Sequence, residues 1–89
     1  MSTLILYTTA GCHLCEDAQA LLGPVLNYIQ QESGQSIALR EQEISESAAL
    51  VDVYGLRIPV IQLEGSTQDL GWPFDQTQAY QFIVDALGN

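Results

Sequence analysis

The apolar residues of this chain change their spacing along the sequence, from a short continuous run to a long helical period. A β-prone run, Thr3–Tyr7, comes first, and a turn of small residues, 8–11, follows it. Beyond the turn, apolar residues recur at helical spacing, at Leu14, Ala18, Leu21, Leu22, Val25, Leu26 and Ile29. This stripe predicts an amphipathic helix with a kink at Gly23-Pro24 and an end at Ser33-Gly34.

The middle of the chain predicts shorter elements. Residues 37–44 alternate apolar with small and polar residues, which favours a strand with Glu41 and Glu43 on one face near its end. Ser45 is expected to cap a short helix over 48–54, and Gly55 is expected to end it.

A hairpin and a last helix complete the pattern. Residues 58–63 predict a strand that opens with proline, 64–66 a turn, and 67–70 a short returning strand. Asp75 and Gln78 form a capping-box pattern for a helix that Gly88 ends. We expect a hydrophobic staple between Phe74 and Ala79, and an apolar helix face made of Tyr80, Ile83, Val84 and Leu87.

The predicted element order is β-α-β-α-β-β-α. A right-handed parallel crossover followed by a hairpin and a helix predicts an α/β fold. We expect a four-stranded mixed sheet with helices on both faces, as one domain over residues 1–89. The length, 89 residues, suits one small hydrophobic core.

The charge balance excludes several partners. The net charge is −9, with two arginines and no lysine. This disfavours nucleic acid and anionic membrane surfaces, because both are bound mainly through cations. An acidic surface that keeps a small protein soluble and a surface that meets a basic protein partner both remain open. No apolar run is long enough to span a bilayer, and no signal-peptide pattern is found, so we expect a cytoplasmic protein.

Two cysteines, Cys12 and Cys15, lie where the first strand hands over to the first helix. A helix N-terminus presents unpaired N–H groups and a positive dipole end, which stabilise the reactive thiolate. A Cys-x-x-Cys in this setting indicates a thioredoxin-like redox motif. Cys12 is the expected nucleophile, and Cys15, one turn deeper, is the expected resolving thiol.

The chain resembles the glutaredoxins, and within them a group of small bacterial glutaredoxin-like proteins of the thioredoxin superfamily. The resemblance covers nearly the whole length. It is carried by four segments, which are Leu6-Tyr7-Thr8-Thr9, Cys12-His13-Leu14-Cys15, Tyr54-Gly55-Leu56-Arg57-Ile58-Pro59-Val60 and Gly71-Trp72-Pro73-Phe74-Asp75.

The resemblance implies a thiol–disulfide oxidoreductase with a substrate-binding loop at Arg57, Ile58 and Pro59. It also implies a cis peptide bond before Pro59. Typical glutaredoxins carry a lysine where this chain has Thr9, and a glycine-rich glutathione clamp where it has Trp72-Pro73. We therefore expect protein disulfides or a thioredoxin-type reductant as partners of a monomer. Glutathione is at most a weak co-substrate, and no other cofactor is expected.

Several interpretations of single residues stay open. Arg57 is expected either to stabilise the Cys12 thiolate or hold a substrate carboxylate, or to pair with an acidic neighbour on the surface. Metal or iron–sulfur binding through Cys12 is a weaker alternative, since a closed zinc site usually wants four ligands. A non-catalytic adaptor with the same fold is a third. Trp72 and Phe74 are expected to pack under the last helix.

Overall fold

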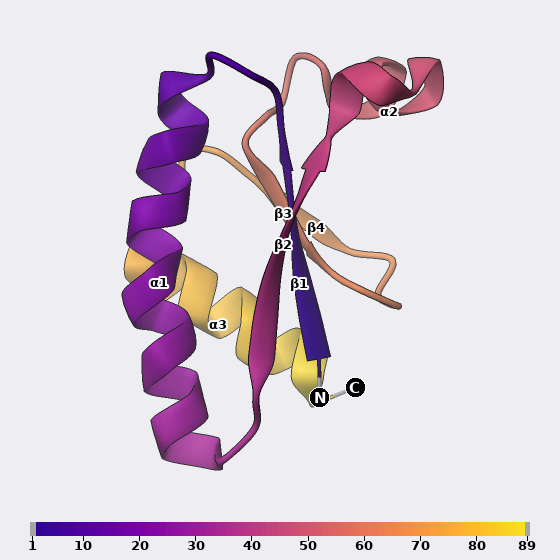
Figure 1. Cartoon of the computed structure of the whole chain (residues 1–89). Coiled ribbons are helices and arrows are strands. Elements are labelled where there is room, and N and C mark those ends of the chain that lie inside the picture. The colour runs from indigo at the N-terminus through magenta and orange to yellow at the C-terminus, as the bar shows by residue number, and fades with distance from the viewer. Residues whose placement is uncertain (1, 89) are drawn as a thin grey trace.

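The computed structural model describes residues 2–88 as a small α/β fold (Figure 1). The predicted domain extends one residue further at each end, and Met1 and Asn89 lie outside the described residues. The element order β-α-β-α-β-β-α is confirmed, with one short 3₁₀-helix added. The elements are β1 (Ser2–Thr8), α1 (His13–Ser33), β2 (Ile37–Glu43), the 3₁₀-helix η1 (Ile44–Glu46), α2 (Ala48–Tyr54), β3 (Val60–Leu63), β4 (Asp69–Gly71) and α3 (Gln76–Leu87).

The four strands form one mixed sheet in the order β2-β1-β3-β4. β1 and β2 run parallel, with Leu6 opposite Glu41 and Thr8 opposite Glu43. β3 is antiparallel to both of its neighbours, β1 and β4. β1 is one of the two inner strands, and its residues 4–7 are buried on both faces, which explains its unbroken apolar run in the sequence.

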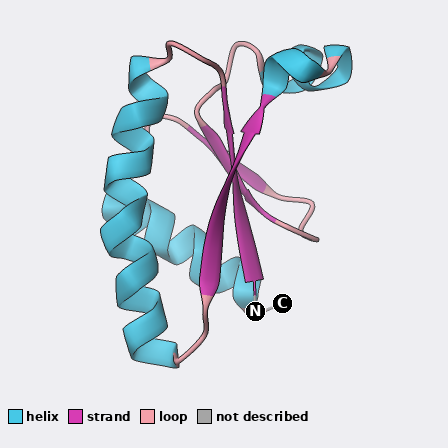
Figure 2. Cartoon of the chain, in the orientation of Figure 1, coloured by secondary structure: helices cyan, strands magenta, loops and turns pink. Residues whose placement is uncertain are grey.

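Helices lie on both sides of the sheet, as predicted, with α1 and α3 along one side and α2 on the other side near the ends of the strands (Figure 2). On one face Leu4 and Leu6 pack with α1 and α3 in the larger core. On the other, Ile5 and Tyr7 pack with residues of η1 and α2 in a smaller core. This division follows from the strand period of two, which sends successive side chains to opposite faces. No described helix is long and apolar enough to cross a membrane.

Helix α1 follows most of its predicted stripe, but Leu14 is exposed and Leu21 is only partly buried. Its fully buried or nearly buried residues are Cys15, Ala18, Leu22, Val25, Leu26 and Ile29. Leu14 was expected in this set and is instead 49% exposed, because it lies in the first turn beside the exposed loop before the helix. The helix runs through Pro24 without interruption, and Gly34 ends it in the left-handed conformation (φ 75°) that glycine favours.

The expected cap of α2 is wrong by two residues. Ser47, not Ser45, is the N-cap, and its hydroxyl accepts a hydrogen bond from the N–H of Leu50 at 3.3 Å. Ser45 lies inside η1, because the carboxylate of Glu43 accepts its N–H at 3.0 Å and caps that turn first. Gly55 follows the helix as predicted.

The hairpin strands are both shorter than predicted. β3 begins at Val60 because Pro59 has no N–H and the N–H of Ile58 bonds back to the Tyr54 carbonyl at 3.0 Å. β4 begins at Asp69, two residues late, after the Ser66 hydroxyl accepts the N–H of Gln68 at 3.2 Å.

Helix α3 confirms its capping box. The Asp75 carboxylate accepts the N–H of Gln78 at 2.7 Å, and the Gln78 side chain accepts the N–H of Asp75 at 2.9 Å. Phe74 and Ala79 are both buried in the larger core, and Trp72 packs edge-on against Phe74 with ring centroids 5.1 Å apart. The two aromatic rings therefore close the core beneath α3.

Candidate functional site

Three segments that are distant in sequence meet at one edge of the sheet (Figure 1). The carboxyl ends of the parallel strands β1 and β2 lie side by side, with Thr8 opposite Glu43. The antiparallel strand β3 enters at the same edge, since Val60 lies opposite Tyr7 and Pro59 comes one residue earlier. The cysteine turn, residues 8–12, is thus bordered by the end of β2 on one side and by the Pro59 loop on the other.

A tight turn presents Cys12 to the start of α1. Gly11 adopts φ 80°, a conformation that other residues rarely take, and the N–H of Cys12 bonds to the Thr9 carbonyl at 3.3 Å. Cys12 is the N-cap residue, and its sulfur accepts a hydrogen bond from the N–H of Cys15 at 3.1 Å. In the reduced protein the same N–H and the helix dipole favour the thiolate at this sulfur.

Cys12 and Cys15 form a disulfide, with Cα atoms 5.2 Å apart. The two sulfurs differ in access to solvent. Cys15 is 4% exposed and packs inside α1, whereas Cys12 is half-buried at the mouth of the turn. An incoming thiol or disulfide would therefore reach Cys12 first.

Glu43 ties the cysteine turn to the end of β2. Its carboxylate accepts the N–H of Ala10 at 2.9 Å with one oxygen and the N–H of Ser45 at 3.0 Å with the other. The hydrogen bond from Ser45, followed by one from the Thr9 hydroxyl, lowers the pKa of Glu43 below its usual value. The ionised carboxylate is therefore the form that holds the turn.

A hollow of about 420 Å³ opens beside the disulfide. The cysteine turn, α1 and the β2–η1 segment line it, and it takes in both cysteines and four glutamates, Glu16, Glu41, Glu43 and Glu46. Glu41 and Glu43 reach it from the same face of β2, as the sequence predicted, and Glu16 comes from the first turn of α1. Its other lining residues are Thr8, Thr9, Ala10, Gly11 and Gln19.

His13 lies on the exposed side of the first helical turn. Its side chain is 93% exposed, and its Nδ1 atom is 3.3 Å from a carboxylate oxygen of Glu16. A His–Glu contact at such exposure contributes little to stability.

The loop before β3 is held by backbone hydrogen bonds at both of its ends. The Ile58–Pro59 bond is cis, and the Pro59 carbonyl accepts the N–H of Trp72 at 2.9 Å. Pro59 is fully buried, whereas the neighbouring Leu56 is fully exposed. The N–H groups of Arg57 and Ile58 both bond back to the Tyr54 carbonyl, at 2.8 Å and 3.0 Å, and so tie the loop to the end of α2.

Arg57 forms a bidentate pair with Asp69. Nη1 bonds to one carboxylate oxygen at 3.2 Å, and Nη2 bonds to the other. The pairing with Asp69 raises the pKa of the guanidinium, whose carbon also lies 5.9 Å from the Tyr54 ring centroid. Of the two interpretations that the sequence left open, the structure shows the ion pair with an acidic neighbour.

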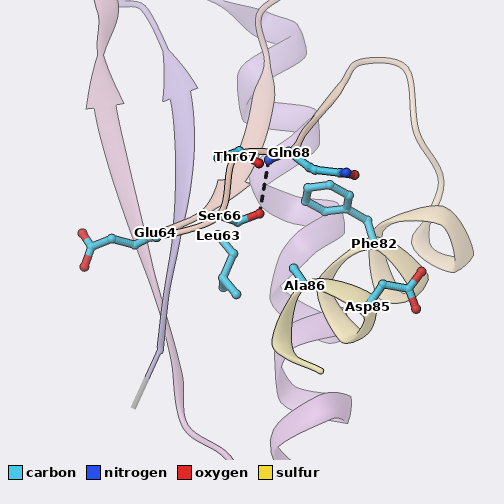
Figure 3. Close-up of a pocket in the computed structure, with 9 residues that line it drawn as sticks. Leu63, Glu64, Ser66, Thr67, Gln68, Phe82, Asp85 and Ala86 are labelled. Atoms are coloured by element: carbon cyan, nitrogen blue, oxygen red, sulfur yellow. Dashed lines mark hydrogen bonds between the residues drawn. The ribbon is translucent and has the colours of Figure 1, made fainter. Parts of the chain in front are cut away.

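A second hollow, of about 500 Å³, lies between the β3–β4 turn and α3 (Figure 3). Its ionisable lining residues are Glu64, which pairs with Arg40 at 3.4 Å, and Asp85. Its lining contains no cysteine and no histidine, so it offers neither a thiol nor an imidazole. The hollow beside Cys12 is the candidate site.

Comparisons with solved structures define the fold class of this chain. The chain is 32% identical to a structural genomics target protein from X. campestris, with a TM-score of 0.73. The match covers 93% of this chain and 97% of that one. The first thioredoxin domain of mouse protein disulfide-isomerase A4 gives a TM-score of 0.63 at 11% identity, over 94% of this chain and 61% of that one. A mutant thioredoxin from Halobacterium salinarum gives 0.61 at 20% identity, over 96% and 74%. The fold is that of the thioredoxin superfamily.

The chain belongs to the family described as glutaredoxin-like domain (DUF836), whose model matches residues 3–83. A search of curated proteins finds no match. A thioredoxin-superfamily fold with a Cys-x-x-Cys pair indicates redox activity of the oxidoreductase type.

Sequence reasoning found the cysteines but missed what surrounds them. It placed Glu41 and Glu43 on one face of a strand without connecting them to the cysteine turn. The missing signal was the parallel pairing of β1 and β2, which brings their carboxyl ends to one edge. The partner of Arg57 was missed as well, because Asp69 is brought close by the hairpin rather than by spacing.

Proposed function

We propose that this chain is a dithiol thiol–disulfide oxidoreductase acting on protein disulfides, with Cys12 as nucleophile and Cys15 as resolving thiol. The difference in exposure between the two sulfurs carries this proposal. The accessible Cys12 sulfur caps the helix and accepts the N–H of Cys15, and the buried Cys15 sulfur forms the disulfide with Cys12.

The reaction runs through a mixed disulfide. The Cys12 thiolate attacks one sulfur of the substrate disulfide, an S–S bond forms to Cys12, and the other substrate sulfur leaves as thiolate and takes a proton from water. Deprotonated Cys15 then attacks the Cys12 sulfur and releases the second substrate thiol. The substrate disulfide gains two electrons, and the protein dithiol becomes the Cys12–Cys15 disulfide.

A thiol reductant must restore the protein. We propose a thioredoxin-type dithiol in the cytoplasm for this role, with Ile58 and Pro59 supporting the bound chain. Metal binding is less well supported, since among the described residues no three His, Cys, Asp or Glu side chains form a set that could hold a metal ion.

Two single substitutions test the mechanism. Cys15→Ser should accumulate a mixed disulfide on Cys12 with a model disulfide peptide, and mass spectrometry would locate it. Cys12→Ser should form none and lose turnover, although it keeps one thiol. Equal trapping by both variants, or no trapping by either, would exclude this assignment of roles.

A further inference from the structure

Among the described residues 2–88, no arginine pairs with the carboxylates around the redox disulfide. The sequence has only two lysine or arginine residues, Arg40 and Arg57. Arg40 pairs with Glu64 at 3.4 Å, and Arg57 pairs with Asp69. Neither of these acidic partners lines the hollow beside Cys12.

The geometry of the hollow brings these carboxylates to one side of Cys12. Leu6 lies opposite Glu41 in the sheet and faces α1, so Glu41 and Glu43 lie on the α1 side of β2. Glu16 approaches from the first turn of α1, and Glu46 from η1. Glu16, Glu41 and Glu46 are exposed to solvent, where an approaching chain can meet them.

Resting on the function proposed above, we infer that the preferred substrates are disulfides flanked by lysine or arginine. A metal ion is a poorer occupant, because these side chains do not converge as a ligand set within residues 2–88. They border an open hollow about 420 Å³ in volume, with the disulfide in its wall. Charges spread in this way suit an extended basic segment whose cysteine reaches Cys12.

The carboxylates are expected to act mainly on the rate at which a substrate associates with the protein. Surfaces of one sign raise the local concentration of oppositely charged partners and speed association, and salt weakens the effect. The same field disfavours acidic substrates, and it opposes the thiolate on Cys12. A comparison between substrates cancels that second effect, because the attacking thiolate is the same for all of them.

The test uses the Cys15→Ser protein and three synthetic peptide disulfides that differ only in flanking residues, which are lysine, glutamine or glutamate. The second-order rate of mixed-disulfide formation on Cys12 is measured by acid quench and mass spectrometry. Each rate is divided by the rate of the same peptide with dithiothreitol, a neutral thiol, which removes the effect of flanking charge on leaving-group reactivity. We expect the corrected lysine-to-glutamate ratio to be on the order of tenfold at low salt and to fall as salt rises.

Two variants, one in the hollow and one far from it, locate the effect. Glu41→Gln combined with Glu46→Gln should bring the ratio several-fold closer to one, because both lie in the hollow and leave the Glu43 contacts intact. Glu32→Gln is the control, since it lies 20 residues beyond Cys12 along the α1 segment, about 30 Å away. It should leave the ratio unchanged.

The outcomes separate the two proposals. A corrected ratio near one, or a ratio that the double substitution leaves unchanged, overturns the inference while disulfide exchange itself stands. If Glu32→Gln lowers the ratio as much as the double substitution does, the preference comes from net charge rather than from the hollow. That result also overturns the inference. No mixed disulfide with any peptide overturns the proposed function.

Discussion

The guanidinium of Arg57 and the carboxylate of Asp69 form a two-point ion pair beside the loop that precedes β3. The side chains are 43% and 23% exposed. This pairing decides how Arg57 acts, because a cation neutralised by a bidentate carboxylate exerts little field on a third group. The positive charge of Arg57 is therefore already paired within the protein, with Asp69.

Replacing Arg57 with alanine is expected to leave the midpoint of the Cys12 thiolate titration unchanged. It should lower the free energy of unfolding by about 1 kcal/mol or less, the usual range for a partly exposed pair. Ultraviolet thiolate absorbance and urea unfolding measure the two effects. Asp69→Ala and the double variant Arg57→Ala with Asp69→Ala complete a double-mutant cycle. A clearly raised midpoint in Arg57→Ala would restore the thiolate-stabilising role.

The two cysteines of the reduced protein should alkylate at different rates. Cys12 is half-buried at the helix start, and Cys15 is 4% exposed. Because alkylation needs an accessible thiolate, Cys12 should react on the order of tenfold faster or more. Limiting iodoacetamide followed by tandem mass spectrometry across residues 12–15 would measure this. The denatured protein is the control, and equal rates in the folded protein would contradict the expectation.

Glu43 should make the fold sensitive to acid. Its pKa is lowered in the folded protein, so its stabilising contribution is fully present above the unfolded value of about 4.3. That contribution is lost as the pH falls through the lowered folded value. Glu43→Gln keeps one acceptor oxygen for two backbone N–H groups and removes the titration. Urea unfolding across this acid range should show a steeper loss in wild type, and parallel curves would refute the proposed contact.

Local signals account for the parts of the fold that the sequence predicted well. The α3 capping box depends on Asp75 and Gln78, three residues apart, and the α1 stripe depends on one helical period. Neither requires knowledge of distant contacts. The cysteine turn was predictable for the same reason, since Gly11 and Cys12 lie directly between a strand and a helix.

The errors arose where a distant or competing group decided the local structure. Ser45 has a hydroxyl suited to capping, but its N–H bonds to the Glu43 carboxylate, and Ser47 caps α2 instead. Glu43 in turn belongs to the site through its bond to Ala10, 33 residues away in sequence. Spacing alone carries no information about such contacts.

Tyr7 should make the fold sensitive to strong alkali. Burial, followed by the neighbouring Tyr54 hydroxyl, raises the pKa of Tyr7 to about 12, and its hydroxyl donates to Gln62 at 2.8 Å. A raised folded pKa means that stability is full below the unfolded value of about 10 and is lost as the pH rises towards 12.

Tyr7→Phe is the matched variant for this effect. It keeps the ring that stacks on Tyr54 at 4.0 Å, but it removes the hydroxyl. We expect it to lose about 1 kcal/mol at neutral pH, the usual value of one such hydrogen bond. Stability measured from pH 8 to pH 11.5 should fall less in the variant than in wild type. An equal fall would show that another group titrates there.

Glutathione should be a poor substrate compared with its use by a typical glutaredoxin. Glutathione is a net anion, and the hollow beside Cys12 is lined by Glu16, Glu41, Glu43 and Glu46. Thr9 stands at the hollow where the family resemblance would place a lysine, and Arg57 is held by Asp69. Pro73 removes one N–H from the region of the expected glutathione clamp.

A glutathione-coupled disulfide reductase assay beside an ordinary glutaredoxin measures this directly, and we expect kcat/KM to be lower by at least about tenfold. Thr9→Lys adds a cation to the hollow but also removes the hydroxyl that bonds to Glu43. Its rate with glutathione is therefore divided by its rate with a neutral peptide disulfide, and this ratio should rise several-fold over that of the wild type. Cys12→Ser gives the background rate. If the wild-type protein uses glutathione with a catalytic efficiency comparable to that of the ordinary glutaredoxin, the four nearby carboxylates do not exclude the anion. In that case backbone contacts, which salt does not screen, would have to outweigh the charge of the hollow.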